Sequence, residues 1–221
     1  MRVRPRTRTF VVTLLGLLPA FGLAVSTVRG SLGANPIETL THETGIWALR
    51  FLLLSLAVSP LRRWLAWSSI AAQRRTLGLL AFAYASAHLL IYAAVDQFLD
   101  WGAIVEDVLE RPYITVGFSA FLCLVPLALT STRRSIRRLG RRWWALHRLV
   151  YPAAGFAGVH FLWGVKADRA EPLAYLAVLA VLFAARLRPA RARTPGALPS
   201  APGRSPAREG CPASVQRLPP S

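Results

Sequence analysis

The sequence is poor in cysteine and in acidic residues. Its two cysteines, Cys123 and Cys211, form no C-x-x-C pair, which argues against a disulfide framework or an iron–sulfur site. No G-x-G-x-x-G motif occurs, and no alternation of strand and helix patterns follows residue 187, so we expect no dinucleotide-binding domain. No internal repeat is evident by inspection.

Long apolar blocks dominate what is present. The hydrophobic fraction is 54% and the mean hydropathy is +0.40, which is too apolar for a soluble domain of 221 residues. We therefore predict an all-α integral membrane protein with a six-helix transmembrane bundle. The predicted spans are residues 10–28, 46–61, 76–95, 113–131, 143–165 and 173–187.

The segments around these spans complete the predicted domain organisation. Residues 1–9 form a basic N-terminus, residues 10–187 the transmembrane domain, and residues 188–221 a disordered tail rich in proline and arginine. We expect a turn-rich loop over residues 29–45 and a short amphipathic surface helix within residues 96–113. Arg50 is expected one turn inside the second span, where its long side chain reaches the headgroups.

Charge patterning predicts the orientation of the bundle. A net charge of +17 would otherwise suggest nucleic acid, but most arginines lie in clusters between or beside the apolar blocks. These basic clusters are residues 1–9, 62–75, 132–148 and the tail, whereas the other connections carry nearly all of the acidic residues. By the positive-inside rule, both termini are cytoplasmic, and we expect no nucleic-acid partner.

Three histidines lie within the predicted spans, where ionisable residues are functional candidates. A neutral imidazole offers a lone pair to a metal without burying a charge. His147 and His160 are thirteen residues, roughly 20 Å, apart along one helix, so they cannot share one metal. If the third and fifth spans run parallel, His88 lies level with His160. Two imidazoles at one level form an axial pair for a six-coordinate haem that relays electrons.

Arg74 and His147 are expected near the cytoplasmic surface, which we call the inner level of the bundle. Fourteen helical steps separate Arg74 from His88, which returns Arg74 to nearly the same face. Its guanidinium has no lone pair for a metal, but it can hold a haem propionate or the phosphate of a flavin nucleotide. His147 is either a haem ligand or an interfacial histidine beside Arg148. A lone membrane histidine is also often a hydrogen-bonding core residue, and His42 is either a residue before the second helix or a cofactor or partner contact.

Seven short motifs carry a resemblance to known membrane proteins. The chain resembles the ferric reductase and NADPH oxidase transmembrane domain, whose six helices hold two haems b through H-x13-H and H-x12-H. Here H-x12-H is intact, while the first pair reads Arg74 and His88. With that substitution, roughly residues 10–187 resemble the MsrQ (YedZ) family through GANP (33–36), HETG (42–45), RRTLGL (74–79), RPYIT (111–115), LALTS (127–131), LHRLVY (146–151) and HFLW (160–163).

This resemblance implies a specific role. The MsrQ family is the haem-binding membrane subunit of a bacterial periplasmic protein-methionine-sulfoxide reductase, and it is also described as binding FMN. Electrons from the quinone pool, or from a cytosolic flavin reductase, would cross the inner membrane through one or two haems b. A periplasmic molybdenum subunit, MsrP, would receive them in a heterodimer and carry out the substrate chemistry. The alternatives are a stand-alone ferric reductase-like electron carrier and a cofactor-free small membrane transporter or scaffold.

Overall fold

The structure is a computed structural model that describes residues 5–65, 68–165 and 168–187. Every regular element in these ranges is a helix, as the sequence predicts. The predicted disordered tail, residues 188–221, lies outside the described residues, and so do residues 1–4 of the basic N-terminus.

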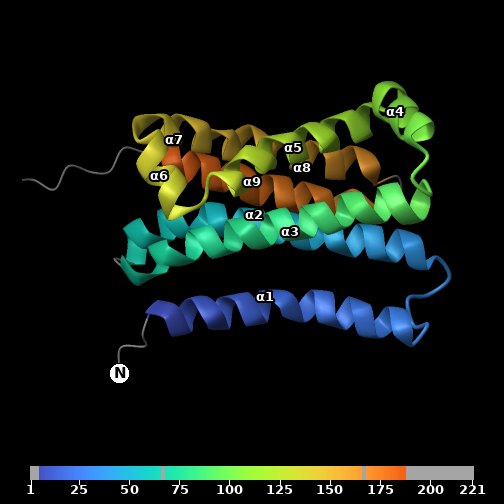
Figure 1. Cartoon of the computed structure of the whole chain (residues 1–221), viewed down its shortest axis with the longest axis horizontal. Coiled ribbons are helices and arrows are strands. Elements are labelled where there is room, and N and C mark those ends of the chain that lie inside the picture. The colour runs from blue at the N-terminus through green and yellow to red at the C-terminus, as the bar shows by residue number, and fades with distance from the viewer. Residues whose placement is uncertain (1–4, 66–67, 166–167, 188–221) are drawn as a thin grey trace, which may run out of the picture. The chain divides into compact units, whose positions relative to one another are not determined.

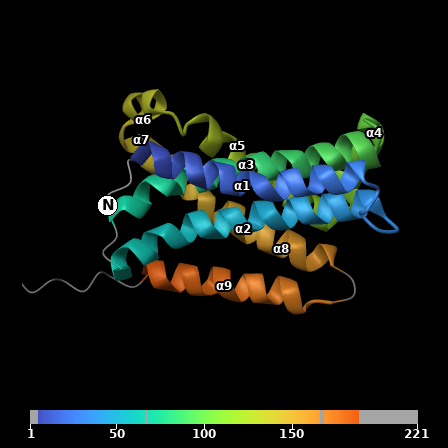
Figure 2. The same cartoon turned by 90° about the horizontal axis from the view of Figure 1, so that it is seen from below.

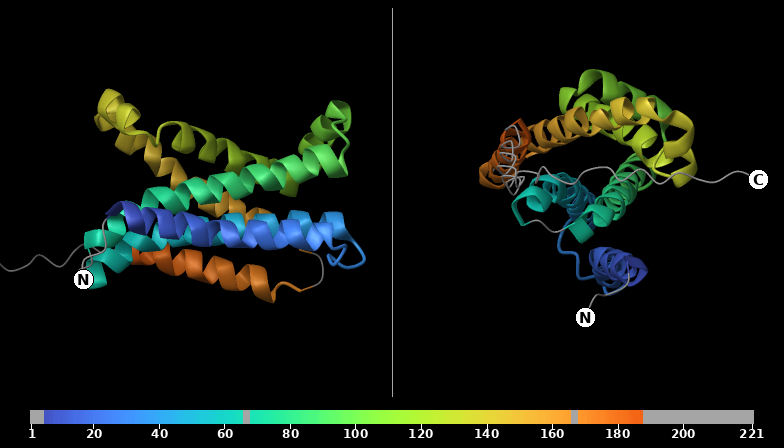
Figure 3. Two further views of the ribbon diagram at one scale, coloured as in Figure 1. Left: turned by 60° about the horizontal axis from the view of Figure 1, so that its bottom comes forward. Right: turned by 90° about the vertical axis from the view of Figure 1, so that its left-hand side faces the viewer.

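Six long helical segments run side by side (Figures 1 and 2). They are α1 (Pro5–Val28), α2 (Pro36–Leu65), α3 (Gln73–Ile91), α5 (Pro112–Leu129), α8 (Val150–Gly164) and α9 (Ala170–Leu187). The chain reverses direction from each of these segments to the next, so that α3 and α8 run parallel (Figures 1 and 3). The end of α9 consequently lies at the same end of the bundle as the start of α1.

Within the described residues, 4 helical stretches are long and apolar enough to cross a membrane. They are Thr7–Val28, Pro36–Trp64, Ile70–Asp96 and Pro112–Leu129. The chain is therefore an integral membrane protein. The fifth and sixth predicted spans correspond to α8, which has 15 residues, and α9, which has 18, and neither belongs to this set of four.

The prediction of a loop over residues 29–45 was wrong for its second half, because α2 already begins at Pro36. The Asn35 side chain accepts a hydrogen bond from the Glu38 backbone N–H and donates one to the Glu38 carboxylate. This reciprocal pair, with proline at the first helical position, is a helix-start signal. Arg50 consequently lies in the middle of α2, and not one turn from its end.

The fifth predicted span is also not one continuous helix. The chain forms α7 (Arg141–Leu146), then a 3-10 turn, η3 (His147–Leu149), and only then α8. Pro152 lies in the first turn of α8, where its missing N–H costs no helical hydrogen bond. His147 therefore precedes the helix that carries His160. The basic loop before α7 also contains a short helix, α6 (Arg133–Leu139).

Short elements connect the long segments at both ends of the bundle. At one end, the 3-10 helix η1 (Ser68–Ala72) leads into α3. At the other, α3 continues into a π-helical turn, η2 (Tyr92–Asp96), and then into α4 (Trp101–Glu110). Asp100 caps α4 by accepting hydrogen bonds from the backbone N–H groups of Gly102 and Ala103. The predicted short helix is thus present.

The core lies between two helical pairs, α2 with α3 and α5 with α8. Leu56 of α2, Ala81 of α3, and Ala153 and Ala154 of α8 are fully buried. Small side chains on α3 and α8 let α3 approach α2, and α8 approach α5, closely, as is common in membrane bundles. Both helices that carry the central histidines are therefore held by the most tightly packed part of the protein.

Candidate cofactor site

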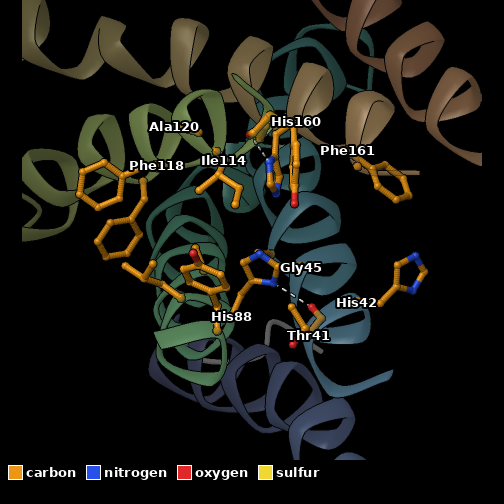
Figure 4. Close-up of a pocket in the computed structure, with 18 of the residues that line it drawn as sticks. Thr41, His42, Gly45, His88, Ile114, Phe118, Ala120, His160 and Phe161 are labelled. Atoms are coloured by element: carbon orange, nitrogen blue, oxygen red, sulfur yellow. Dashed lines mark hydrogen bonds between the residues drawn. The ribbon is translucent and has the colours of Figure 1, made fainter. Parts of the chain in front are cut away.

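His88 of α3 and His160 of α8 face each other across a cavity (Figure 4). Their ring centroids are 6.0 Å apart, and their planes are almost perpendicular, at 81°. The parallel course of α3 and α8 places the two side chains at one level. The structure thus brings together the two residues that the sequence pairs.

The hydrogen bonds of the two imidazoles define which ring nitrogen is free. Nδ1 of His88 lies 2.7 Å from the Thr41 carbonyl oxygen, and Nδ1 of His160 lies 2.7 Å from the Tyr113 carbonyl oxygen. A carbonyl oxygen only accepts hydrogen bonds, so each Nδ1 carries the proton. Nε2 of each ring therefore keeps its lone pair, and this pattern is typical of metal-binding histidines.

Two glycines provide the space in which these rings lie. A β-carbon on Gly45 of α2 would come within 3.0 Å of His88 Nδ1, and one on Gly117 of α5 within 2.6 Å of His160 Nδ1. The distance at Gly117 is shorter than real β-carbons show, so a larger residue there would push the His160 ring aside, whereas at Gly45 the His88 ring would have to give by a few tenths of an ångström. Each imidazole is thus hydrogen-bonded to a backbone carbonyl and packed against a glycine.

The distance between the rings would fit a metal ion held between them. Two metal–nitrogen bonds of about 2 Å, with each nitrogen about 1 Å from its ring centre, place the centroids roughly 6 Å apart. Among the described residues, no group of three or more His, Cys, Asp or Glu side chains is placed to share a metal. The pair therefore suits a metal that brings its other ligands with it, as the iron of a porphyrin does.

The cavity around the pair has room for a large, flat, apolar group. Its volume is about 580 Å³, within the range of cofactor sites. Apolar side chains from α2, α3, α5 and α8 form most of its wall, among them Leu49, Leu52, Phe121 and Leu124. Polar and charged side chains are concentrated near the α4 end of the bundle, where Glu38, Asp96 and Arg111 also line the cavity.

The two halves of the site repeat one another, which inspection of the sequence missed. The hydrogen-bonded residues are 47 positions apart in both halves, Thr41 with His88 and Tyr113 with His160. Each residue of the first half lies 72 positions before its counterpart in the second half, and this interval also relates Gly45 to Gly117. It further relates the buried pairs Leu52 with Leu124 and Ala81 with Ala153. The α2–α3 and α5–α8 pairs therefore hold one imidazole each in the same way.

The predicted inner pair, Arg74 and His147, lies away from this cavity. His147 belongs to η3, where its ring stacks on Trp143 at 3.8 Å and its Nδ1 lies 3.2 Å from the Trp143 carbonyl oxygen. Arg74, in the first turn of α3, is close enough for its charge to act on His147 and Arg186. Arg74 and His147 thus share one end of the bundle, although no direct bond joins them.

Arg186 of α9 extends this inner group and was not identified from the sequence as a site residue. Its terminal nitrogens donate to the Tyr151 hydroxyl at 2.8 Å and to the Leu56 carbonyl oxygen at 2.5 Å, and its buried Nε has no hydrogen-bond partner. No ion pair involves Arg74 or Arg186 in the described part of the chain. Two arginines without a carboxylate favour an anionic ligand.

His42 lies inside α2 and not before the second helix, so the helix-start interpretation was wrong. It lines the same cavity, and its ring lies 6.0 Å from that of Phe161. Figure 4 shows it set apart from the His88–His160 pair. It is therefore a cavity residue but no third member of the pair.

Comparison with known proteins places the chain in a class and then in a family. Residues 44–158 match the family model of the ferric reductase like transmembrane component, so the chain is a ferric reductase-like membrane protein. No solved structure matches it.

Relatives named protein-methionine-sulfoxide reductase heme-binding subunit MsrQ match most of the chain. The Rhodospirillum rubrum protein is 50% identical over 202 residues, which covers 90% of this chain and 97% of the relative. The Deinococcus radiodurans protein is 52% identical over 186 residues, covering 83% and 92%, and the Brucella ovis protein is 48% identical, covering 83% and 84%. The chain belongs to the MsrQ family.

Proposed function

We propose that this chain is the haem-binding membrane subunit of a protein-methionine-sulfoxide reductase and relays electrons across the bacterial inner membrane. The observation that carries the proposal is the opposed pair of imidazoles, His88 and His160, with ring centroids 6.0 Å apart. The names of the MsrQ relatives, which describe heme-binding subunits of such a reductase, support it independently.

His88 and His160 would hold a haem b, each through its free Nε2. A haem held by two imidazoles would supply one-electron transfer. The Thr41 and Tyr113 carbonyls fix the tautomers and the ring orientations, which keeps both ligands in place in either oxidation state. The apolar wall of the cavity excludes water from the metal.

The route of the electrons follows from a topology of six crossings with both termini in the cytoplasm. The alternating direction of the six long segments and the basic clusters at one end of the bundle support this topology. His88 and His160 then lie toward the periplasm. The acceptor is a periplasmic molybdenum-containing subunit, MsrP, and the donor is the quinone pool or a cytosolic flavin reductase.

The inner end of the bundle holds a second cofactor beside His147 and Arg74. Either a second haem with His147 as a ligand or an FMN fits here, because both carry anionic groups. Arg74 and Arg186 provide positive charge without a neutralising carboxylate in the described residues, and arginine binds carboxylates and phosphates through paired N–H groups. Electrons would enter here and leave through the outer haem.

Absorbance spectra of purified protein test the outer site. Wild-type protein should show a Soret band and the spectrum of a bis-imidazole haem. H88A and H160A should each abolish or strongly reduce that spectrum, because each removes one of two axial ligands. H42A is the matched control, since His42 lines the same cavity outside the pair. Colourless wild-type protein would leave only the transporter or scaffold alternative, and an unchanged H160A spectrum would refute the ligand pair.

The identity of the electron acceptor is tested by measuring electron transfer from the reduced protein. Protein reduced chemically under anaerobic conditions is mixed with a periplasmic methionine-sulfoxide reductase subunit or with a ferric chelate, and haem reoxidation is followed by absorbance. The proposal expects rapid reoxidation by the reductase subunit in the presence of methionine sulfoxide. Reoxidation by the chelate alone would instead identify a stand-alone ferric reductase-like carrier.

A further inference from the structure

A buried carboxylate lies beside the outer end of the cavity. Asp107 of α4 is only 9% exposed. Its Oδ2 accepts hydrogen bonds from the Tyr92 hydroxyl at 2.8 Å and from Gln97 Nε2 at 3.3 Å. Its Oδ1 lies 3.0 Å from Nε of Arg111. Both oxygens are thus engaged, and a carboxylate that is held so firmly can in turn fix the group it pairs with.

Arg111 is the group that Asp107 fixes. The carboxylate contacts only Nε, so its ion pair leaves the terminal nitrogens of the guanidinium free of Asp107, on a side chain that is 56% exposed. The Tyr113 hydroxyl, as a hydrogen-bond partner, and then the Asp107 carboxylate raise the pKa of Arg111 above its ordinary value. The guanidinium therefore stays charged and oriented.

Arg111 lines the same cavity as His88 and His160. It is the only lysine or arginine in the described wall of that cavity, where the other fully charged side chains are Glu38 and Asp96. An anionic group on a ligand would be repelled by these two carboxylates and attracted by Arg111. The cavity thus has one position at its outer end that suits an anion.

We infer that Arg111 binds a propionate carboxylate of the haem held between His88 and His160, and that Asp107 is its positioning residue. The inference rests on the proposed function, because it requires a haem in the outer site. Haem carries its two propionates on one edge, so a single fixed guanidinium also defines which way the macrocycle lies in the cavity. Arginine suits this role because its planar fork matches a carboxylate.

The test compares R111Q with R169Q in the purified holoprotein. Arg169 is an exposed residue of the connection before α9, toward the same end of the bundle, and does not line the cavity. Two quantities are measured: the rate of haem transfer to excess apomyoglobin and the midpoint potential of the haem in a spectroelectrochemical titration. R111Q should release haem roughly tenfold faster or more, as expected for loss of a charge-assisted hydrogen bond.

The midpoint potential of R111Q should fall, because an unneutralised propionate favours the ferric state. R169Q should leave both quantities near their wild-type values. R111K retains the positive charge but not the planar guanidinium with its paired N–H groups. Its midpoint potential should therefore stay near that of wild type, while its haem release should still be faster. The inference is overturned if R111Q matches R169Q in both measurements while the bis-imidazole spectrum is intact. A wild-type protein without haem would refute the proposed function instead.

Asp107 is tested through a double-mutant cycle with Arg111. D107N should accelerate haem release in the wild-type background and change it little in the R111Q background, because its effect passes through the guanidinium. D100A, which removes the oxygen that caps α4, controls for loosening of that helix and should act equally in both backgrounds. Additive effects of D107N and R111Q would overturn the positioning role.

Discussion

Gly117 lies directly against the imidazole of His160, and a β-carbon at position 117 would come within 2.6 Å of Nδ1. G117A should therefore displace the ring and weaken haem binding, with a cost of about 1–3 kcal/mol for overpacking. Haem content per protein, measured from the Soret absorbance, checks this. G155A is the matched control on α8, because nothing lies within 4 Å of a β-carbon there. Equal haem content in the two variants would contradict the claim that the His160 ring needs the space left by Gly117.

H147A should leave the spectrum of the outer bis-imidazole haem intact. His147 stacks on Trp143 at the opposite end of the bundle, so its loss affects only the inner cofactor. The ratio of haem to protein and the content of released flavin are the measurements. R74Q should lower the amount of this inner cofactor bound per protein, whereas R75Q, at the exposed neighbouring position, should leave it unchanged. Loss of the outer spectrum in H147A would show that the two levels are not independent.

Y84F should loosen the attachment of α1. The Tyr84 hydroxyl donates to the Gly16 carbonyl oxygen at 2.8 Å and accepts from the Ala20 N–H at 2.9 Å. Removing it should cost about 1–3 kcal/mol of the free energy of unfolding. The thermal unfolding temperature in detergent should fall while the haem spectrum stays unchanged. The residue 72 positions further along is Phe156, which has no hydroxyl. An unfolding temperature equal to wild type would argue against this contact.

Arg50 and Tyr175 should be energetically coupled. Arg50 Nε donates to the Tyr175 hydroxyl at 2.7 Å, whereas Glu171 is 3.9 Å away and 46% exposed. A double-mutant cycle of R50Q and Y175F in denaturant unfolding should give a coupling of about 0.5–2 kcal/mol. E171Q should change stability by less, about 0–1 kcal/mol, because the ion pair is long and partly exposed. A coupling near zero between Arg50 and Tyr175 would mean that the bond does not hold α9 to α2.

The positions of the helices could largely be predicted from the apolar blocks, but several of their ends could not. The start of α2 was missed although Asn35, Pro36 and Glu38 carry a helix-start pattern, because turn-forming residues follow as far as Gly45. The break before α8 was missed because residues 143–165 read as a single apolar run. In both cases local capping and proline chemistry decided what hydropathy could not distinguish.

The facing of His88 and His160 could be predicted from spacing and helix direction. Their supporting residues could not, because Thr41 and Tyr113 contribute only backbone carbonyl oxygens, which no residue type reveals. Gly45 and Gly117 are likewise ordinary helix glycines until α2 and α5 pack against the histidines. The repeat interval of 72 residues was the available signal, since it relates both glycines and both histidines.

The sequence by itself determined a membrane protein with basic and acidic ends, and it determined which helices carry imidazoles. These properties follow from hydropathy, charge and helical periodicity, which depend on residues close together in the chain. The tertiary structure decided which nitrogen of each imidazole is free, how far apart the rings lie, and that Asp107 orients Arg111 at the cavity. Each of these depends on atoms from different helices, and only packing brings those helices together.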